Sequence, residues 1–460
     1  MQFIRNHKFE IAIFLLAFAL RFLYLAISLD YRDGNLINTI AGADGYYSIS
    51  QNILAGHGFS SAGNPPYVLN SYRPPMMPYF IAWMYMIFGS YWAVIIIYMI
   101  LSSLLAILAI RISEFLTKSE AVSALVGMFI AIEPYTIVFS TIFYGETLFM
   151  FFFFLSILFL FKYLKGNMLS RLLLSAFFLG TATLTKPVVQ YLPIIAMAIM
   201  IWNIKKKSLP SYVPIALYGL VFLVTISPWV YRNYKEFNII GISSQANVQI
   251  YEMLVPSTLA IENDTSWGEE YHKLLNSGTG VIDVNASNIK DTDDYLKRAI
   301  PVLLAHPAAL IVLSANTALN FFIHDGMYDV LRRIGLSPKV SLRKPALFLL
   351  LTSPKEIFSE IIDRTTKPEI LILVGRVLWT IITIASFAGV ALYIKKGLTP
   401  YALVAILTTG YFMLTALSIG LAVNARYRLP VNLFIIFFAL YALLIFWKPS
   451  DSIRSYKINQ

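Results

Sequence analysis

The chain has 460 residues, of which 58% are hydrophobic and only 13% charged, and it carries a formal net charge of +11 and no cysteine. Its continuous apolar runs cannot be covered by one water-soluble core, so the composition predicts a polytopic helical membrane protein. The lack of cysteine excludes disulfides, thiolate nucleophiles and cysteine metal sites. Because the basic residues are scattered over the turns between apolar runs, nucleic acid is not expected as a partner.

Ten apolar segments follow one another along the chain, and the first is expected to stay in place as an uncleaved helix. Most are close to the ~20 residues that cross ~30 Å of hydrocarbon. They are 9–29, 79–110, 120–140, 145–164, 170–185, 188–203, 212–230, 370–394, 400–422 and 430–447. The sequence therefore predicts an all-α membrane protein of about 10 to 12 spans with outer loops and interfacial helices.

Two apolar stretches depart from this simple pattern. Met76–Phe88, at the start of the long second segment, is followed by Gly89 and Ser90 and is expected to lie at the membrane interface. Residues 299–322 are apolar enough for a further span, but prolines and polar residues interrupt them. We expect a broken or surface-lying helix there.

The distribution of lysine and arginine orients the chain. With the N-terminus in the cytoplasm, most basic turns fall on the cytoplasmic side, as the positive-inside rule requires. Both ends are then cytoplasmic, and two long segments, 30–75 and 231–368, lie outside. The predicted domains are a transmembrane module 1–230 with its first outer loop 30–75, an extracytoplasmic or interfacial region 231–368 and C-terminal membrane helices 369–460. The predicted location is the cytoplasmic (inner) membrane.

Two acidic residues stand where outer loops meet apolar segments. Asp44 follows the first span, and its carboxylate is suited either to deprotonate an acceptor hydroxyl or to bind a metal ion. A solvated aspartate or a helix cap is the plainer interpretation. Glu146 precedes an apolar run and would cost ~2.5 kcal/mol or more at the bilayer centre without a partner, so it is expected to face a wet cavity. The cofactor requirement stays open, and a divalent metal at Asp44 is one alternative.

Cations occupy other outer helix ends, against the general charge bias. Lys186, Arg232 and Arg426 each lie beside an apolar segment, and Arg73 is followed by two prolines that restrain its backbone. In one interpretation these side chains have no function beyond placing their charge in water from the membrane interface. They are equally suited to hold a lipid phosphate as point charges or bidentate forks.

In order, these segments resemble the GT-C superfamily of polyprenyl-phosphate-sugar-dependent glycosyltransferases, in the prokaryotic branch similar to protein O-mannosyltransferases and the lipid A aminoarabinose transferase. The matching pieces are Asp44 with Tyr47, Gly56-His57-Gly58-Phe59, Arg73-Pro74-Pro75 with Pro78, Glu146, Thr185-Lys186-Pro187, Pro228-Trp229 with Arg232-Asn233, and Arg426-Tyr427 with Pro430. The sequence departs from the mannosyltransferases at Gly45, where they tend to carry a second acid. It departs from the aminoarabinose enzyme at Tyr72, where that enzyme has an acidic residue before the arginine. Neither substrate is therefore assigned.

The resemblance implies that Asp44 is the catalytic aspartate and that Glu146 takes the second acidic position. The residues implied at the donor phosphate are Arg73, Lys186, Arg232 and Arg426. The residues implied to bind the rest of the substrate are Tyr47, His57 and Tyr72. The implied reaction is an inverting transfer of a hexosyl or pentosyl group from a polyprenyl-phosphate donor. The implied acceptor is a glycan, a lipid or a protein on the outer face of the membrane. Membrane lipids are the other expected partners.

Two other functions remain open. A lipid or polysaccharide transporter or flippase would line a path through the bilayer with charges, but the candidate residues gather on one face and no internal repeat is evident. An O-antigen polymerase or ligase would use pyrophosphate-linked donors. No nucleotide-binding or zinc-hydrolase motif is present.

Overall fold

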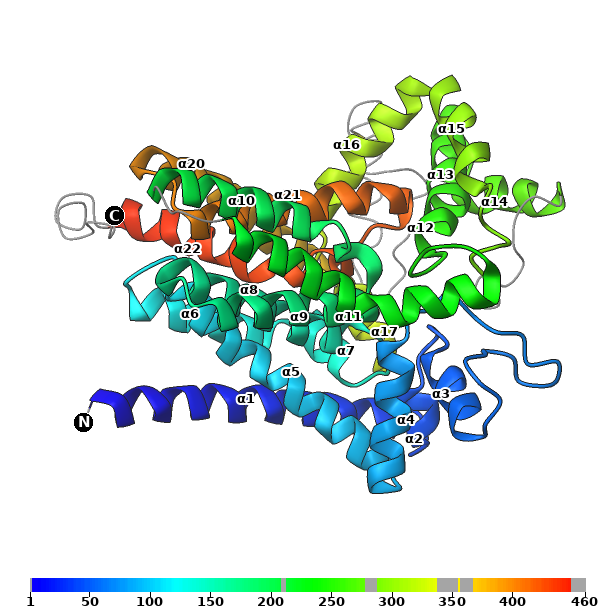
Figure 1. Ribbon diagram of the computed structural model, residues 1–460, viewed down its shortest axis with the longest axis horizontal. Helices are drawn as coiled ribbons and strands as arrows, with labels where there is room; N and C mark the ends of the chain where they lie inside the picture. Colours follow the sequence, from blue (N-terminus) through cyan, green and yellow to red (C-terminus); the bar gives the residue numbers. More distant parts are fainter. Residues whose placement is uncertain (1, 208–211, 278–287, 337–354, 356–366, 448–460) are drawn as a thin grey trace.

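The computed structural model describes residues 2–207, 212–277, 288–336, 355 and 367–447. Apart from an isolated bridge between Ser60 and Leu69, these residues form helices and the loops between them. Long apolar helices lie side by side as a bundle, and short helices gather at one end of it (Figure 1). The all-α membrane fold predicted from the sequence is confirmed.

The helices of the bundle come from both halves of the chain. They are α1 (Gln2–Asp30), α5 (Tyr91–Ser113), α6 (Glu120–Ile132), α8 (Glu146–Gly166), α9 (Leu169–Thr185), α10 (Leu192–Lys207), α11 (Val213–Phe237), α20 (Lys367–Lys396), α21 (Pro400–Ala416) and α22 (Asn432–Trp447). Six helices among the described residues are long and apolar enough to cross a membrane, or up to eight if each of two bent pairs counts as one span. Helices α9, α10 and α22 are apolar but shorter. The number of spans stays a prediction.

Three of the predicted apolar stretches are interrupted. The long segment predicted over 79–110 is divided where Gly89 and Ser90 indicated, because Gly89 (φ 65°) ends a separate helix α4 (Met76–Phe88) in a left-handed conformation that glycine adopts without a Cβ clash. Glu133 is extended before a proline, and α6 meets α7 (Pro134–Ser140) there at 52°. Helices α15 (Tyr295–Ala305) and α16 (Pro307–Ile323) meet at 103°. The helix break predicted within 299–322 is therefore present.

Small residues bring helices of the bundle into close contact. A Cβ added at Gly389 of α20 would lie 1.9 Å from the carbonyl oxygen of Phe438 in α22. One added at Gly180 of α9 would lie 2.7 Å from the side chain of Thr225 in α11. Such close backbone approach is how membrane helices gain packing energy where the hydrophobic effect is weak.

Two buried arginines connect different helices of the bundle. Arg21 of α1 donates to Ser102 Oγ at 2.8 Å and to the carbonyl oxygen of Ala131 at 3.0 Å. Arg428 donates to the carbonyl oxygens of Phe321 (2.9 Å) and His324 (2.7 Å). Because a buried charge is costly unless it is hydrogen-bonded, both arginines lock specific helix ends together.

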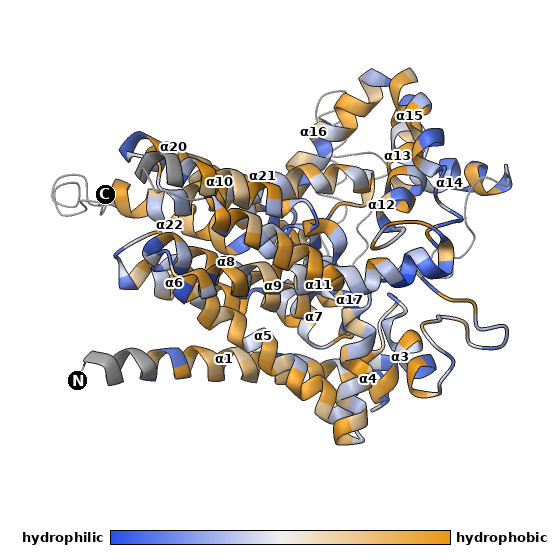
Figure 2. Cartoon of the chain, in the orientation of Figure 1, coloured by the Kyte–Doolittle hydropathy of each residue, from blue (hydrophilic) through white to orange (hydrophobic). Residues whose placement is uncertain are grey.

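The short helices at one end of the bundle come from the two predicted outer segments. They are α2 (Leu36–Ile40), α3 (Tyr46–Leu54), α12 (Gln245–Val248), a π-helical turn (Gln249–Leu254), α13 (Val255–Glu262), α14 (Trp267–Asn276) and α17 (Met327–Arg333). Tyr72 and residues of α12 to α15 form a small core, which contains Val248, Tyr251, Val255, Tyr295 and Ala299. Hydrophilic residues gather here and at the end of α11, whereas the bundle is mostly hydrophobic (Figure 2). The predicted domain boundaries stay predictions, and 278–287, 337–354, 356–366 and 448–460 lie outside the described residues.

Candidate functional site

Two carboxylates and three cations from four separate segments meet beside the N-terminus of α8. Asp44 and Arg73 come from the first outer loop, and Glu146 is the first residue of α8. Lys186 directly follows α9, and Arg426 lies in the 3-10 helix η4 (Ala425–Tyr427). We call these five residues the ion-pair cluster.

Arg426 joins the two carboxylates. Its Nη2 donates to Asp44 Oδ2 at 2.6 Å, and its Nε donates to Glu146 Oε1. The guanidinium also lies over the ring of Tyr144, 4.8 Å from the ring centre. A planar guanidinium presents several donors in fixed directions, so one side chain can hold two acids.

The other two cations each approach one carboxylate. Lys186 Nζ donates to Glu146 Oε1 at 2.5 Å. Arg73 Nη2 lies 3.5 Å from Asp44 Oδ1, and its guanidinium lies over the rings of Tyr72 (4.6 Å) and Tyr46 (5.3 Å). The loop conformation thus places Arg73 against Asp44.

The cluster has an excess of positive charge, and two of its three cations, Lys186 and Arg426, are its most exposed members. Three cations and two carboxylates give a formal charge of +1. The side chains of Lys186 and Arg426 are each 23% exposed, whereas that of Glu146 is 3% exposed. An anion that approaches from solvent therefore meets cations first. Glu146 Oε2 is buried and has no hydrogen-bond partner among the described residues.

Asp44 is ionised at neutral pH because of its cationic neighbours. Burial of the carboxyl raises its pKa, but the charges of Arg426 and then Arg73 outweigh burial and lower the pKa of Asp44 to about 2. In this arrangement Asp44 is a counter-ion and a weak proton acceptor.

A tight turn presents Asp44 to the cluster. Gly42 has φ +70°, and a Cβ added to it would lie 2.4 Å from Cε1 of Tyr144. The next backbone amide, that of Ala43, donates to the Tyr144 hydroxyl at 3.1 Å. Gly45, at φ 74°, directly precedes α3. Only glycine fits the first position, because it combines positive φ with close contact.

The arrangement does not fit the divalent metal that the sequence left open at Asp44. Among the described residues, no group of three or more metal-ligating side chains is present. Both oxygens of Asp44 are already approached by guanidinium groups, and Arg426 spans the two carboxylates.

The structure places the remaining predicted site residues beside the cluster or away from it. Arg232 donates from Nη1 to the carbonyl oxygen of Asn70 at 2.9 Å, and its Nη2 is buried without a hydrogen-bond partner among the described residues. Tyr47 packs on Tyr91 with ring centres 5.3 Å apart. His57 is exposed and stacks on Tyr67. In the contacts of the described residues, none of Arg232, Tyr47 and His57 pairs with the ion-pair cluster, whereas Tyr72 lies under Arg73.

Two tyrosines of the site were not predicted from the sequence. Tyr46 is buried next to Arg73, and Tyr144 supports both Arg426 and the turn before Asp44. Their only signal is that each stands two residues from a candidate acid. Tyrosine is also common at membrane interfaces, so that signal alone did not separate the two roles.

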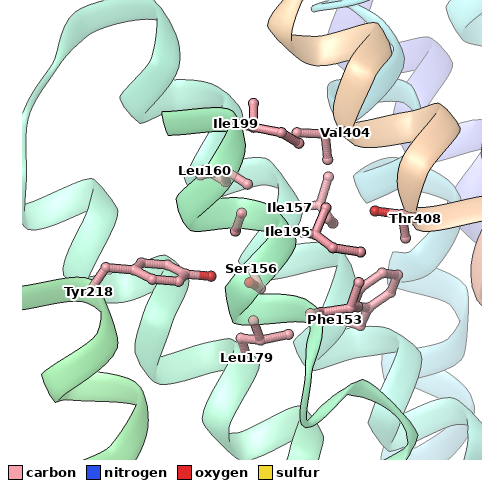
Figure 3. A pocket seen from close by; sticks show the side chains of 12 residues that line it. Phe153, Ser156, Ile157, Leu160, Leu179, Ile195, Ile199, Tyr218, Val404 and Thr408 are labelled. Atoms are coloured by element: carbon pink, nitrogen blue, oxygen red, sulfur yellow. The ribbon is translucent and has the colours of Figure 1, made fainter. Parts of the chain in front are cut away.

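Two hollows in the protein lie elsewhere. A cavity of about 20 Å³ inside the bundle is lined by Phe153, Ser156, Leu179, Tyr218 and Thr408, among others (Figure 3). It has room for roughly one water molecule. An open apolar groove of about 540 Å³ runs between α10 and α11. No member of the ion-pair cluster lines either one.

The bundle and its charged cluster define a multi-pass membrane protein with an anion-attracting site at helix ends. Residues 72–231 match the family described as dolichyl-phosphate-mannose-protein mannosyltransferase. This segment is about a third of the chain and contains Arg73, Glu146 and Lys186. The match confirms the resemblance to the GT-C superfamily that the sequence suggested.

Two solved structures match the chain at low sequence identity and with TM-scores below 0.5. AglB, the archaeal oligosaccharyltransferase from Archaeoglobus fulgidus in complex with an inhibitory peptide and a dolichol-phosphate, is 12% identical over 95% of this chain and 51% of its own, with a TM-score of 0.46. ArnT from Cupriavidus metallidurans, bound to undecaprenyl phosphate, is 13% identical over 93% of this chain and 77% of its own, with a TM-score of 0.38. The chain thus spans about half the length of AglB. No curated protein sequence matches it significantly.

Proposed function

We propose that the protein transfers a sugar from a polyprenyl-phosphate-linked donor to an acceptor at the outer face of the cytoplasmic membrane. The observation that carries this proposal is the convergence of Arg73, Lys186 and Arg426 around two carboxylates at one end of a membrane bundle. A polyprenyl-phosphate sugar carries one negative charge, and the polyprenyl phosphate that leaves gains a second. Fixed cations stabilise a leaving group whose charge grows in this way.

In this reaction an acceptor hydroxyl oxygen attacks the anomeric carbon of the sugar. The bond from that carbon to the phosphate oxygen breaks, and its electron pair leaves with the phosphate. Asp44 takes the proton of the acceptor hydroxyl, and a single displacement inverts the anomeric carbon. Glu146 keeps Lys186 and Arg426 in place.

Residues around the cluster serve the donor and acceptor in this proposal. The ring of Tyr72 packs against the guanidinium of Arg73, and Arg232 has a buried Nη2 that can donate to the substrate. Tyr47 and His57 of the first outer loop contact other parts of the donor or acceptor. A donor anchored in the bilayer by its prenyl chain reaches the cluster already oriented, which lowers the entropic part of the barrier.

The experiment that tests this function offers purified, reconstituted protein two sets of labelled donors, polyprenyl monophosphate sugars and polyprenyl pyrophosphate sugars. Membrane fractions supply glycan, lipid and protein acceptors. We expect label to reach an acceptor from a monophosphate donor. Transfer from pyrophosphate donors alone would indicate a polymerase or ligase. Movement of intact donor across the membrane without cleavage would indicate a flippase, and either result overturns the proposal.

A further inference from the structure

Arg426 engages two of its three guanidinium nitrogens with carboxylates of the protein. Its Nε and Nη2 are both committed to carboxylates of the protein, at Glu146 and Asp44. A phosphate that enters the cluster presents oxygens with the same preference for a guanidinium fork. It therefore competes with the carboxylates of the protein for one side chain.

We propose that the donor phosphate takes Arg426 over from Asp44, and that this exchange releases the carboxylate for the acceptor hydroxyl. The inference rests on the proposed function, because it takes the ligand to be a prenyl-linked phosphate. In the absence of a donor, the carboxylates of Asp44 and Glu146 thus bind the guanidinium in place of the phosphate.

The surroundings of Arg426 permit such an exchange without moving the backbone. Two residues later, Arg428 is anchored by the carbonyl oxygens of Phe321 and His324, which fixes the segment against the end of α16. The Arg426 side chain is 23% exposed, so it has room toward solvent. After the exchange, Asp44 keeps Arg73 as a neighbour and Glu146 keeps Lys186. Neither carboxylate is left alone.

The exchange also resolves a conflict between the position of Asp44 and its task. A general base works best when its pKa is near the working pH, whereas burial and the overriding charges of Arg426 and Arg73 leave the pKa of Asp44 at about 2. Moving Arg426 to the phosphate removes one of these charges from the carboxylate. Asp44 is thus a base only when a donor is present.

The exchange predicts a change in the phosphate affinity of Asp44→Asn that a purely structural role of Asp44 would not produce. Asp44→Asn removes the competing charge but keeps the size of the side chain, so Arg426 is more available to phosphate. Polyprenyl phosphate should then bind about fivefold or more tightly, the lower end of typical coupling effects. Sugar transfer should be lost at the same time.

The test measures the affinity of purified protein in detergent for a long-chain polyprenyl phosphate, with inorganic phosphate as a second probe. It compares wild type, Asp44→Asn and Arg426→Gln with the control Asp294→Asn, which removes a carboxylate from an exposed pair with Arg298. We expect tighter binding by Asp44→Asn, weaker binding by Arg426→Gln and no change in the control. Tighter binding of both probes supports a phosphate exchange, and tighter binding of polyprenyl phosphate alone supports one that also needs the lipid chain.

The failures of the two proposals are distinguishable. If the wild type binds polyprenyl phosphate but Asp44→Asn binds it equally or more weakly, the exchange is overturned and the proposed function stands. If the wild type binds no polyprenyl phosphate, both are overturned. A misfolded variant would lose affinity, so it would not imitate the expected gain. Glu146→Gln provides a second variant, because it removes the other carboxylate that holds Arg426.

Discussion

Arg426 donates a hydrogen bond of 2.6 Å to Asp44 across 382 positions of the chain. This contact joins the first outer loop to the segment between the last two bundle helices. The site therefore exists only when both ends of the sequence are folded against each other. Its stability and its chemistry depend on the same few side chains.

Replacing the bridging arginine should destabilise the protein. Arg426→Gln leaves the buried Glu146 and the largely buried Asp44 with less positive charge, and breaking a buried pair from one side costs about 3 kcal/mol. Thermal unfolding in detergent measures the loss. The control Arg298→Gln breaks the exposed pair with Asp294 and should cost less than about 1 kcal/mol. Equal losses in the two variants would show that the cluster is not a buried network.

The turn before Asp44 should tolerate no side chain. Gly42→Ala places a Cβ against Tyr144 at a positive φ, so we expect lower stability and lower transfer activity. Gly56→Ala is the matched control, because Gly56 also has positive φ (+77°) but nothing lies within 4 Å of its added Cβ. That variant should show only the backbone cost of about 1 kcal/mol. Similar activity of the two variants would argue against a positional role for the turn.

The stabilising effect of Asp44 should depend on pH in a specific window. Its pKa falls from 3.8 to about 2 on folding. A lowered pKa stabilises the folded state at pH values above the unfolded pKa, and this contribution, about 2 kcal/mol, disappears as the pH falls through the folded pKa. The difference in unfolding free energy between wild type and Asp44→Asn should thus stay constant from about pH 7 to pH 5 and shrink only below about pH 4. A decline that begins near neutral pH would show that Asp44 is not held by these cations.

The lysine beside Glu146 should contribute mainly to donor binding. Lys186→Met keeps most of the chain length and removes the charge, so we expect a higher KM for the donor, by about tenfold, since charge-assisted hydrogen bonds are worth ~1.5–3 kcal/mol. Lys186→Arg should recover part of the affinity. Initial rates over a range of donor concentrations separate KM from kcat. An unchanged KM together with a lower kcat would move Lys186 from binding to chemistry.

The fold was more predictable than the site, for physical reasons that particular residues illustrate. A helix break within 299–322 could be predicted, but it falls at His306–Pro307, while Pro301 stays inside α15. Asp44 and Glu146 stood out because carboxylates beside apolar runs are costly without partners.

The contacts among the candidates were not predictable, since pairing between distant segments leaves no local periodicity. Lys186 and Arg232 look alike in the sequence, as cations near outer helix ends. The structure pairs Lys186 with Glu146, but it directs Nη1 of Arg232 to a backbone carbonyl of the first outer loop. Residue type and helix position therefore suggest candidates for a site and leave their partners undecided.

The most direct measurement is the rate of sugar transfer from a labelled polyprenyl monophosphate donor by membrane vesicles that contain either wild type or Asp44→Asn at equal amounts of folded protein. Removing a general base reduces the rate by about a hundredfold or more. We predict a loss of this size with the protein still folded. Transfer at the wild-type rate by Asp44→Asn would contradict the account.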